Sequence, residues 1–243
     1  MPKIPQVSPD TTRRTMLQLY GQVDEIVRRL IAESTNDPVS CRRGCAHCCT
    51  IATVSTLGEC RAIAHHLHRR ADWADWLPKL RQSALSYCES KVFDRDFYFR
   101  KGGHRCPFLD EKLQECRIYE IRPACCRLHF SIDPAEMCSA AHEGTVRYLD
   151  LKKLQALIWR RSSALVPHLP LAAAPVPLAV LYFMQEHRPE RQRLVLQHFE
   201  GLVDPITWYD QYGKLKTEAD PAPAEVADLP KEQEEPSAEA KEG

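Results

Sequence analysis

The sequence has no excess of either charge and no long apolar run. Its 33 lysines and arginines balance 33 aspartates and glutamates, so the total charge favours neither nucleic acid nor a membrane surface as a partner. The longest uncharged stretch, residues 169–184, contains three prolines and is too short to span a bilayer. Residues 1–15 lack the apolar segment of a secretory signal. We therefore expect a soluble, cytoplasmic protein.

Recognisable catalytic motifs are also missing. The sequence contains no evident Ser–His–Asp arrangement, phosphate-binding loop or pair of carboxylates spaced for acid–base chemistry. Any catalysis is therefore expected to depend on a metal centre, and whether the protein is an enzyme stays open.

Cysteine is the residue type that stands out. There are 11 cysteines, an odd number, and two pairs are adjacent in the chain, Cys48–Cys49 and Cys125–Cys126. Adjacent cysteines pair with each other poorly, because a disulfide needs a specific separation and torsion. Since a reducing cytosol keeps thiols free, a disulfide framework is the least favoured explanation.

Seven cysteines form two blocks whose spacing suits a metal. The first block is CRRGCAHCC at residues 41–49, and together the blocks contain Cys41, Cys45, Cys48, Cys49, Cys106, Cys116 and Cys126. Short gaps let one turn of backbone direct several thiolates at one zinc ion or iron–sulfur cluster. Gly44 permits the positive φ angle that wrapping a metal often requires. We predict that the blocks converge on one centre held by about four thiolates, leaving the others for a second site, a bridge or a free reactive cysteine.

The remaining cysteines and the nearby arginines are less distinctive. Cys60 and Cys88 are isolated within helical stretches, where a reduced cysteine usually acts as a small apolar residue. Cys125 and Cys138 could be either ligands or buried thiols. Six arginines stand near the cysteines in the chain: Arg42, Arg43, Arg105, Arg117, Arg122 and Arg127. They either offset the charge of the thiolates or are ordinary surface residues.

Hydrophobic periodicity predicts a mainly α fold around a small cysteine-rich metal module with little β structure. Thr11 or Thr12 is expected to cap the first helix, and Glu59 is the expected capping-box acid of the second. The expected helices cover residues 11–31, 55 or 56 to about 70, roughly 72–94, 145–165 and 189–203, the last two separated by proline-rich sequence. A strand stub at residues 50–55 and a hairpin formed by the runs CPFL and CRIY complete the pattern.

The domain boundaries follow from composition. We expect a single helical domain over residues 11–213, with the metal module at about residues 38–140. Residues 1–10 are expected to be disordered. Residues 214–243, rich in Glu, Ala and Pro with nine acidic and four basic residues, are expected to form a disordered acidic tail.

The order of these motifs resembles one known family. CRRGCAHCC, a helix carrying Glu59, CPFLD and C-R-I-Y-E-x-R-P-x-x-C-R are together similar to the CxxCxxCC (YkgJ-type) family of zinc- or iron-chelating domains, over about residues 41–130. The resemblance implies that the seven cysteines of the two blocks are the metal ligands. The matching framework residues are Pro107, Phe108, Leu109, Tyr119, Arg122, Pro123 and Arg127.

The match to the family pattern is incomplete at two points. Cys125 falls at a position that the motif leaves free, and the loop DEKLQE lacks an expected glycine. The family also includes flagellin lysine methylases, in which a cysteine-bound cluster is implicated. This chain is shorter than those enzymes, so the resemblance does not transfer that activity.

Other interpretations of the same residues fit less well. The spacing C-x3-C-x2-C also binds the cluster of radical S-adenosylmethionine enzymes, but here a helix precedes it, His47 stands before the third cysteine and no series of strands follows. A thioredoxin-like motif at Cys45 and Cys48 lacks the surrounding βαβ pattern. The histidines at residues 65, 66 and 68 indicate a solvated basic helix end rather than a metal site.

Three functions remain open from the sequence. They are a metal-cluster protein that performs or assists a redox or methyl-transfer-like reaction, a zinc-stabilised binding module without catalysis, and a metal handling or storage protein. The surplus of thiolates and the arginine density favour an iron–sulfur cluster slightly over zinc, because a closed zinc site is satisfied by four ligands. Thiolates by themselves suit both metals. Apart from the metal ion, the sequence indicates no partner.

Overall fold

The computed structural model describes residues 7–33, 38–89, 105–139, 142, 144–167 and 173–186. Within these residues the fold is mainly α, as predicted, and the β structure consists of two short two-stranded sheets. The helices are α1 (Pro9–Glu33), α2 (Leu57–His68), α3 (Trp76–Glu89), α4 (Ala124–Arg127), α5 (Lys152–Ser163) and α6 (Val176–Met184). In the described part of the chain, no helix is both long and apolar enough to cross a membrane.

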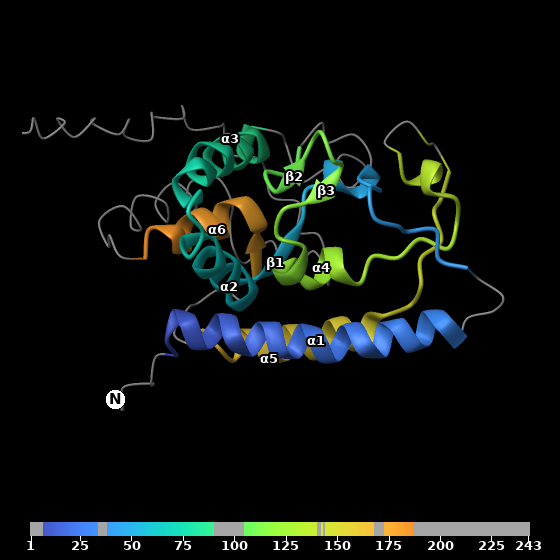
Figure 1. Cartoon of the computed structure of the whole chain (residues 1–243), viewed down its shortest axis with the longest axis horizontal. Helices are drawn as coiled ribbons and strands as arrows, with labels where there is room; N and C mark the ends of the chain where they lie inside the picture. The colour runs from blue at the N-terminus through green and yellow to red at the C-terminus, as the bar shows by residue number, and fades with distance from the viewer. Residues whose placement is uncertain are drawn as a thin grey trace, which may run out of the picture.

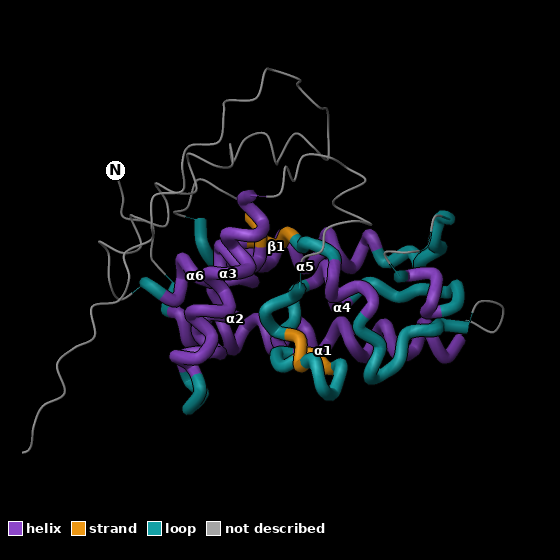
Figure 2. Tube along the Cα trace, turned by 90° about the horizontal axis from the view of Figure 1, so that it is seen from above, coloured by secondary structure: helices purple, strands orange, loops and turns teal. Residues whose placement is uncertain are grey.

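The scaffold consists of one long helix and a cluster of shorter ones. Helix α1 runs along one side of the molecule with α5 beside it, while α2, α3 and α6 pack together at one end (Figure 1). Loops and short elements occupy much of the other end (Figure 2). The cysteine blocks therefore lie on segments with little regular structure that are held against a helical scaffold.

Helix α1 begins two residues earlier than predicted. The sequence predicts Thr11 or Thr12 as its cap, and this is wrong: Ser8 Oγ accepts a hydrogen bond from the Thr11 backbone N–H at 3.1 Å. Pro9 occupies the first helical position, where its missing N–H costs nothing. Thr12 is instead buried, and its hydroxyl donates to the Ser8 carbonyl at 3.0 Å.

The start of α2 agrees with the sequence prediction. Thr56 caps the helix, its side chain accepts from the Glu59 N–H, and the Glu59 carboxylate accepts from the Thr56 N–H. This reciprocal pair is the predicted capping box. The strand predicted at residues 50–55 is present only at its end, as β1 (Val54–Thr56), because Thr50 belongs to a 3₁₀ helix. Strand β1 pairs antiparallel with β4 (Ala173–Pro175), so that Ser55 lies opposite Ala174.

Strand β4 and helix α6 are absent from the sequence prediction, which takes this region as a proline-rich separator between two helices. Pro175 stands at the N-cap of α6 and Pro177 within its first turn, positions that tolerate proline. Eight of the nine residues of α6 are buried, so the helix is apolar on all sides. A helix buried all round has no amphipathic period to detect. The helix expected at residues 189–203 and the expected tail at 214–243 lie outside the described residues.

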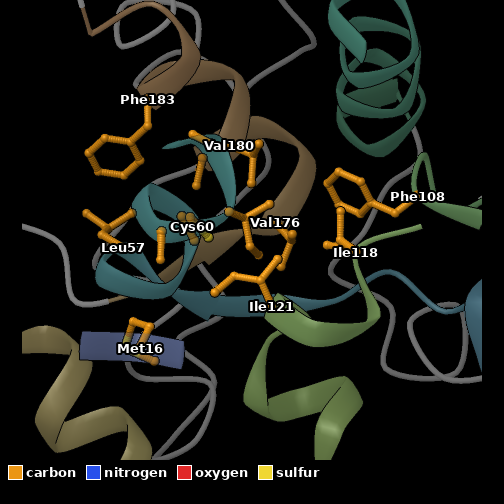
Figure 3. Close-up of a cluster of buried hydrophobic side chains, with 14 of the residues drawn as sticks. Met16, Leu57, Cys60, Phe108, Ile118, Ile121, Val176, Val180 and Phe183 are labelled. Carbon is orange, nitrogen blue, oxygen red and sulfur yellow. The ribbon is translucent and has the colours of Figure 1, made fainter. Parts of the chain in front are cut away.

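The core is formed where α1, α2 and α6 meet. Figure 3 shows Met16, Leu57, Cys60, Val180 and Phe183 in this cluster. Cys60 is fully buried among them and acts as a small apolar residue, as predicted. The same cluster continues toward the cysteine blocks through Phe108, Ile118, Ile121 and Val176 (Figure 3).

Helices α2 and α5 approach each other closely at a glycine. A Cβ atom added at Gly58 would lie 2.0 Å from the Ser162 carbonyl oxygen. The Ser162 hydroxyl also lies 2.7 Å from the Thr56 hydroxyl. The contact therefore requires a residue without a side chain at position 58.

We predict opposite effects of alanine at two helical glycines. Gly58→Ala should lower the free energy of unfolding by about 1–3 kcal/mol, because α5 must move away from α2. Gly21→Ala is the matched control, since nothing lies within 4 Å of a Cβ atom there. It should raise the free energy of unfolding by about 0.5–1 kcal/mol through helix propensity. Urea unfolding measures both values, and equal effects would contradict the close approach.

Candidate metal centre

All seven cysteines of the two blocks border one cavity of about 620 Å³. They are Cys41, Cys45, Cys48, Cys49, Cys106, Cys116 and Cys126. Apolar side chains of the core, among them Phe108, Ile118 and Val176, form another part of the wall. The structure thus brings both blocks to one place, although Cys41 and Cys126 lie far apart in the chain.

The first block turns sharply at Gly44. Gly44 has φ of 82°, and the Cys45 N–H donates to the Arg42 carbonyl at 3.1 Å. The positive φ predicted for this glycine is present. The chain then enters a short 3₁₀ helix, η1 (His47–Thr50), which carries Cys48 and Cys49.

The second block is joined directly to the first. The Cys106 N–H donates to the Cys49 carbonyl at 2.9 Å. The predicted hairpin follows, formed by β2 (Leu109–Asp110) and β3 (Glu115–Cys116), with Leu109 opposite Cys116. Cys126 lies on α4, after a short 3₁₀ helix, η4 (Tyr119–Ile121), that ends before Pro123.

The hairpin turn forms without the glycine that the family resemblance leads one to expect. Gln114 takes the positive φ angle itself, at 54°. Its side-chain amide donates to the Glu111 carbonyl at 2.7 Å, and Asp110 Oδ1 accepts from the N–H groups of Lys112 and Leu113. These local hydrogen bonds offset the steric cost of the left-handed conformation.

Backbone N–H groups are directed at several of the sulfurs. The Ser131 N–H donates to Cys41 Sγ at 3.2 Å, and backbone hydrogen bonds from Phe108 and Ile118 lower the pKa of Cys106 and Cys116 against the larger raising effect of burial. N–H donors stabilise thiolates and are among the interactions that tune metal centres.

Burial and mutual repulsion oppose ionisation of the gathered thiols. Burial raises the pKa of Cys41, Cys106 and Cys116, and neighbouring thiolates raise it further. Cys48 is the exception, because a hydrogen bond with Cys49, helped by the charge of Arg122, lowers its pKa to about 7. The same hydrogen bond raises the pKa of Cys49. Metal binding here therefore has to displace protons, which makes it pH-dependent.

The donor set fits a thiophilic metal in kind and number. Among the described residues, however, no three His, Cys, Asp or Glu side chains are close enough together to hold an ion as they stand. Turning a cysteine between staggered rotamers moves its sulfur by about 3 Å, so ligation requires the side chains to turn inward. That these seven cysteines bind a metal stays a prediction.

The six arginines near the cysteines have different roles. The charge of Arg122 lowers the pKa of Cys48, Cys116 and Cys126 against other effects, so this side chain faces the thiols. Its guanidinium lies 4.1 Å from the centre of the Tyr119 ring, and its Nε is buried without a hydrogen-bond partner. Arg43, Arg105 and Arg117 instead form ion pairs with carboxylates at the surface. Arg122 borders the cavity, and its charge is among the main influences on these three thiols.

The other cysteines and the histidines lie elsewhere. Cys125 does not border the cavity, although its Sγ is 3.9 Å from that of Cys126, and the side chain of Cys88 lies outside the described residues. The histidines at the end of α2 are half-buried, not solvated as predicted, because each lies against a different neighbour. These contacts are His65 with Asp10, His66 with Glu120, and His68 with the Met184 carbonyl.

The sequence prediction missed one histidine in the cavity wall, a residue type that can bind a metal. His129 borders the cavity, its Nε2 is buried without a hydrogen-bond partner, and its ring centre is 4.2 Å from that of Tyr148. In the sequence, the only indication of this position is that His129 stands three residues after Cys126. The residue does not belong to a recognised metal-ligand spacing, so it was not predicted.

Comparison with known proteins agrees with the cysteine pattern. Residues 40–143 match the model of the family CxxCxxCC, described as "Putative zinc- or iron-chelating domain". We refer to residues 40–143 as the CxxCxxCC domain, after the family model that they match. The resemblance drawn from the sequence is thereby confirmed, and the match indicates a zinc- or iron-chelating function. No curated protein and no solved structure matches the chain.

Glu59 anchors the second block of the CxxCxxCC domain to the helical scaffold. It is fully buried, and its Oε1 accepts from the Tyr20 hydroxyl and the Ala124 N–H, both at 2.7 Å. Its Oε2 accepts from the Ser55 hydroxyl at 2.6 Å and from Thr56. One carboxylate therefore fixes α1, β1 and the start of α4, two residues before Cys126.

Arg127 forms a second anchor at the other end of α4. Its side chain is 2% exposed, pairs with Asp24 of α1 at 2.6 Å and donates to the Glu120 carbonyl at 2.7 Å. The guanidinium also lies 4.1 Å from the centre of the Tyr20 ring. The matching framework arginine of the CxxCxxCC domain is thus a structural residue and does not face the thiols.

Removing the Glu59 carboxylate should destabilise the CxxCxxCC domain strongly. Glu59→Ala leaves the donors of Tyr20, Ser55 and Ala124 buried without an acceptor, so the free energy of unfolding should fall by on the order of 3 kcal/mol or more. Glu59→Gln keeps one acceptor oxygen, so its free energy of unfolding should fall less than that of Glu59→Ala. Glu25→Ala, which removes an exposed carboxylate paired with Arg29, should leave the urea midpoint nearly unchanged. A wild-type midpoint for Glu59→Ala would show that Glu59 does not hold these segments together.

Proposed function

We propose that the CxxCxxCC domain binds an iron–sulfur cluster and that the cluster takes part in a redox or group-transfer reaction. The supporting observation is the arrangement of the thiols: seven border one cavity of about 620 Å³, and among the described residues no three possible ligands lie close enough together to hold a single ion. A zinc ion needs four sulfurs drawn in to about 2.3 Å from one centre. A cluster occupies the space between its cysteines, so it suits ligands spread around a cavity better.

The residues around the cavity are suited to hold a charged centre. Four of the seven cysteines would ligate the cluster, which supplies electron transfer when bound. Arg122 offsets the negative charge of the thiolates, and the backbone donors to Cys41, Cys106 and Cys116 stabilise them. The apolar wall formed by Phe108, Ile118 and Val176 limits access of water to this side. Because the sequence offers no evident acid–base or nucleophile motif, the chemistry is assigned to the centre.

A reducing compartment is part of this proposal. Free thiols gathered for a metal persist where glutathione and thioredoxin keep them reduced, so we place the protein in the cytoplasm.

Anaerobic purification with metal analysis tests the cluster. Brown protein with iron, labile sulfide and broad visible absorption is the expected result. Cys49→Ser and Cys126→Ser should lose metal, whereas Cys60→Ala, in the apolar core away from the cavity, should keep it. Colourless protein with stoichiometric zinc would contradict the iron–sulfur cluster but would still support metal chelation. Protein that contains neither metal would contradict metal chelation as well.

The charge of Arg122 gives a second test, specific to a redox-active cluster. Removing a positive charge beside the thiolates favours the oxidised cluster, so Arg122→Gln should make the reduction potential more negative, by on the order of tens of millivolts. Arg122→Lys should shift it less. Arg117→Gln is the matched control, because Arg117 pairs with Asp110 and Asp72 away from the cavity. Equal potentials in wild type and Arg122→Gln, measured by redox titration, would contradict the placement of this charge.

A further inference from the structure

The cavity is larger than a metal centre requires. Its volume is about 620 Å³. If each ion of a cubane iron–sulfur cluster took up about 30 Å³, the share of one molecule in liquid water, the whole cluster would fill less than half of this volume. Pockets of roughly 300–1,000 Å³ with mainly apolar walls are typical sites for small organic molecules. The cavity therefore has room for an organic ligand beside the metal centre.

Two side chains of the cavity wall contain a buried nitrogen atom without a hydrogen-bond partner among the described residues. These atoms are Nε of Arg122 and Nε2 of His129. Each side chain is held in place by an aromatic ring. The Arg122 guanidinium lies 4.1 Å from the centre of the Tyr119 ring, and the His129 ring centre lies 4.2 Å from that of Tyr148. Since buried polar groups are usually hydrogen-bonded, two such nitrogens in one wall indicate a ligand with polar atoms.

The charged side chains of the wall favour an anion. Four arginines and one glutamate border the cavity, and these are Arg42, Arg43, Arg105, Arg122 and Glu115. Arg43 pairs with Glu115, and Arg105 pairs with Glu111. In the part of the chain that the structure describes, Arg42 and Arg122 have no carboxylate partner. Because Arg42 is exposed and Arg122 is half-buried, an ion pair with Arg122 is less screened by water.

We propose that the cavity binds a small organic carboxylate beside the metal centre, with the carboxylate on Arg122 and the rest of the molecule against the apolar wall. That wall contains Phe108, Ile118 and Val176. The planar fork of a guanidinium matches a carboxylate, and its five N–H donors allow Arg122 to bind one while its charge still acts on the thiols. His129 Nε2 is available for a second polar group of the ligand.

A carboxylate fits this site better than a phosphate does. It carries one negative charge, which a single half-buried arginine can neutralise, whereas a phosphate monoester carries about two near neutral pH. The inference rests on the proposed function, because it names the substrate class of the reaction at the cluster.

Ligand-observed NMR on the full-length protein, purified anaerobically with its metal, tests the carboxylate site. The probes are hexanoate and phenylacetate, the neutral amide of each, acetate and phenyl phosphate. Hexanoate and phenylacetate should bind at millimolar concentration, about tenfold or more tightly than their amides, because hydrogen bonds between charged groups are the stronger ones. Acetate should bind more weakly than hexanoate, because it lacks an apolar part.

Variants locate the carboxylate. Arg122→Gln should weaken carboxylate binding about tenfold or more and leave amide binding nearly unchanged, and Arg122→Lys should keep part of the preference for the acid. A loss of fold, checked by circular dichroism, would weaken acid and amide alike. Arg117→Gln is the matched control and should bind as the wild type does, because Arg117 pairs with Asp110 and Asp72 away from the cavity. Unchanged carboxylate binding in folded Arg122→Gln would overturn the site.

Metal analysis of the same samples separates this inference from the proposed function. Metal-containing protein that binds neither hexanoate nor phenylacetate, or binds acid and amide equally, would overturn the carboxylate site alone. Protein without metal that still prefers the acids would overturn the cluster and retain the site, and protein with neither property would overturn both. Tighter binding of phenyl phosphate than of phenylacetate would overturn the carboxylate as the class of ligand.

Discussion

The buried carboxylate of Glu59 is the interaction on which the arrangement of the domain depends. A buried charge without a direct ion pair is stable only when hydrogen-bond donors surround it, and Glu59 receives them from Tyr20, Ser55, Thr56 and Ala124. Tyr20 and Ala124 belong to segments that are distant from Glu59 in the chain, whereas Ser55 and Thr56 directly precede α2. The requirement to satisfy one carboxylate therefore fixes the relative positions of α1, β1, α2 and α4.

This arrangement separates a rigid scaffold from the adaptable ligand segments. The apolar core and the Glu59 and Arg127 anchors hold the ends of α4. Six of the seven cysteines of the two blocks lie on loops, on the 3₁₀ helix η1 or on strand β3, and the side chains of all seven are half-buried. Such side chains can turn toward a metal without moving the core. The scaffold would therefore keep most of its helical structure when metal is absent, unlike a small zinc module whose fold depends on the ion.

The sequence predicted the local features and missed those that depend on tertiary contacts. The Thr56–Glu59 capping box, the turn at Gly44 and the hairpin depend on residues close together in the chain, so their motifs were sufficient. Helix α6 was missed because a helix buried on all sides has no amphipathic period, and because the prolines at its start are typical of a loop. The position of His129 depends on how the chain returns after α4, which no spacing rule encodes.

The position of α6 in the chain has a consequence for synthesis. Val176 and Pro177 form part of the cavity wall, yet they follow Cys126, the last cysteine of the two blocks. At about 5–20 residues per second, translation takes several seconds to pass from that cysteine to α6. During this interval the nascent chain already contains every cysteine of both blocks but cannot complete the wall. Before α6 is synthesised, the thiols are therefore more accessible to metal donors and to oxidants than they are in the folded protein.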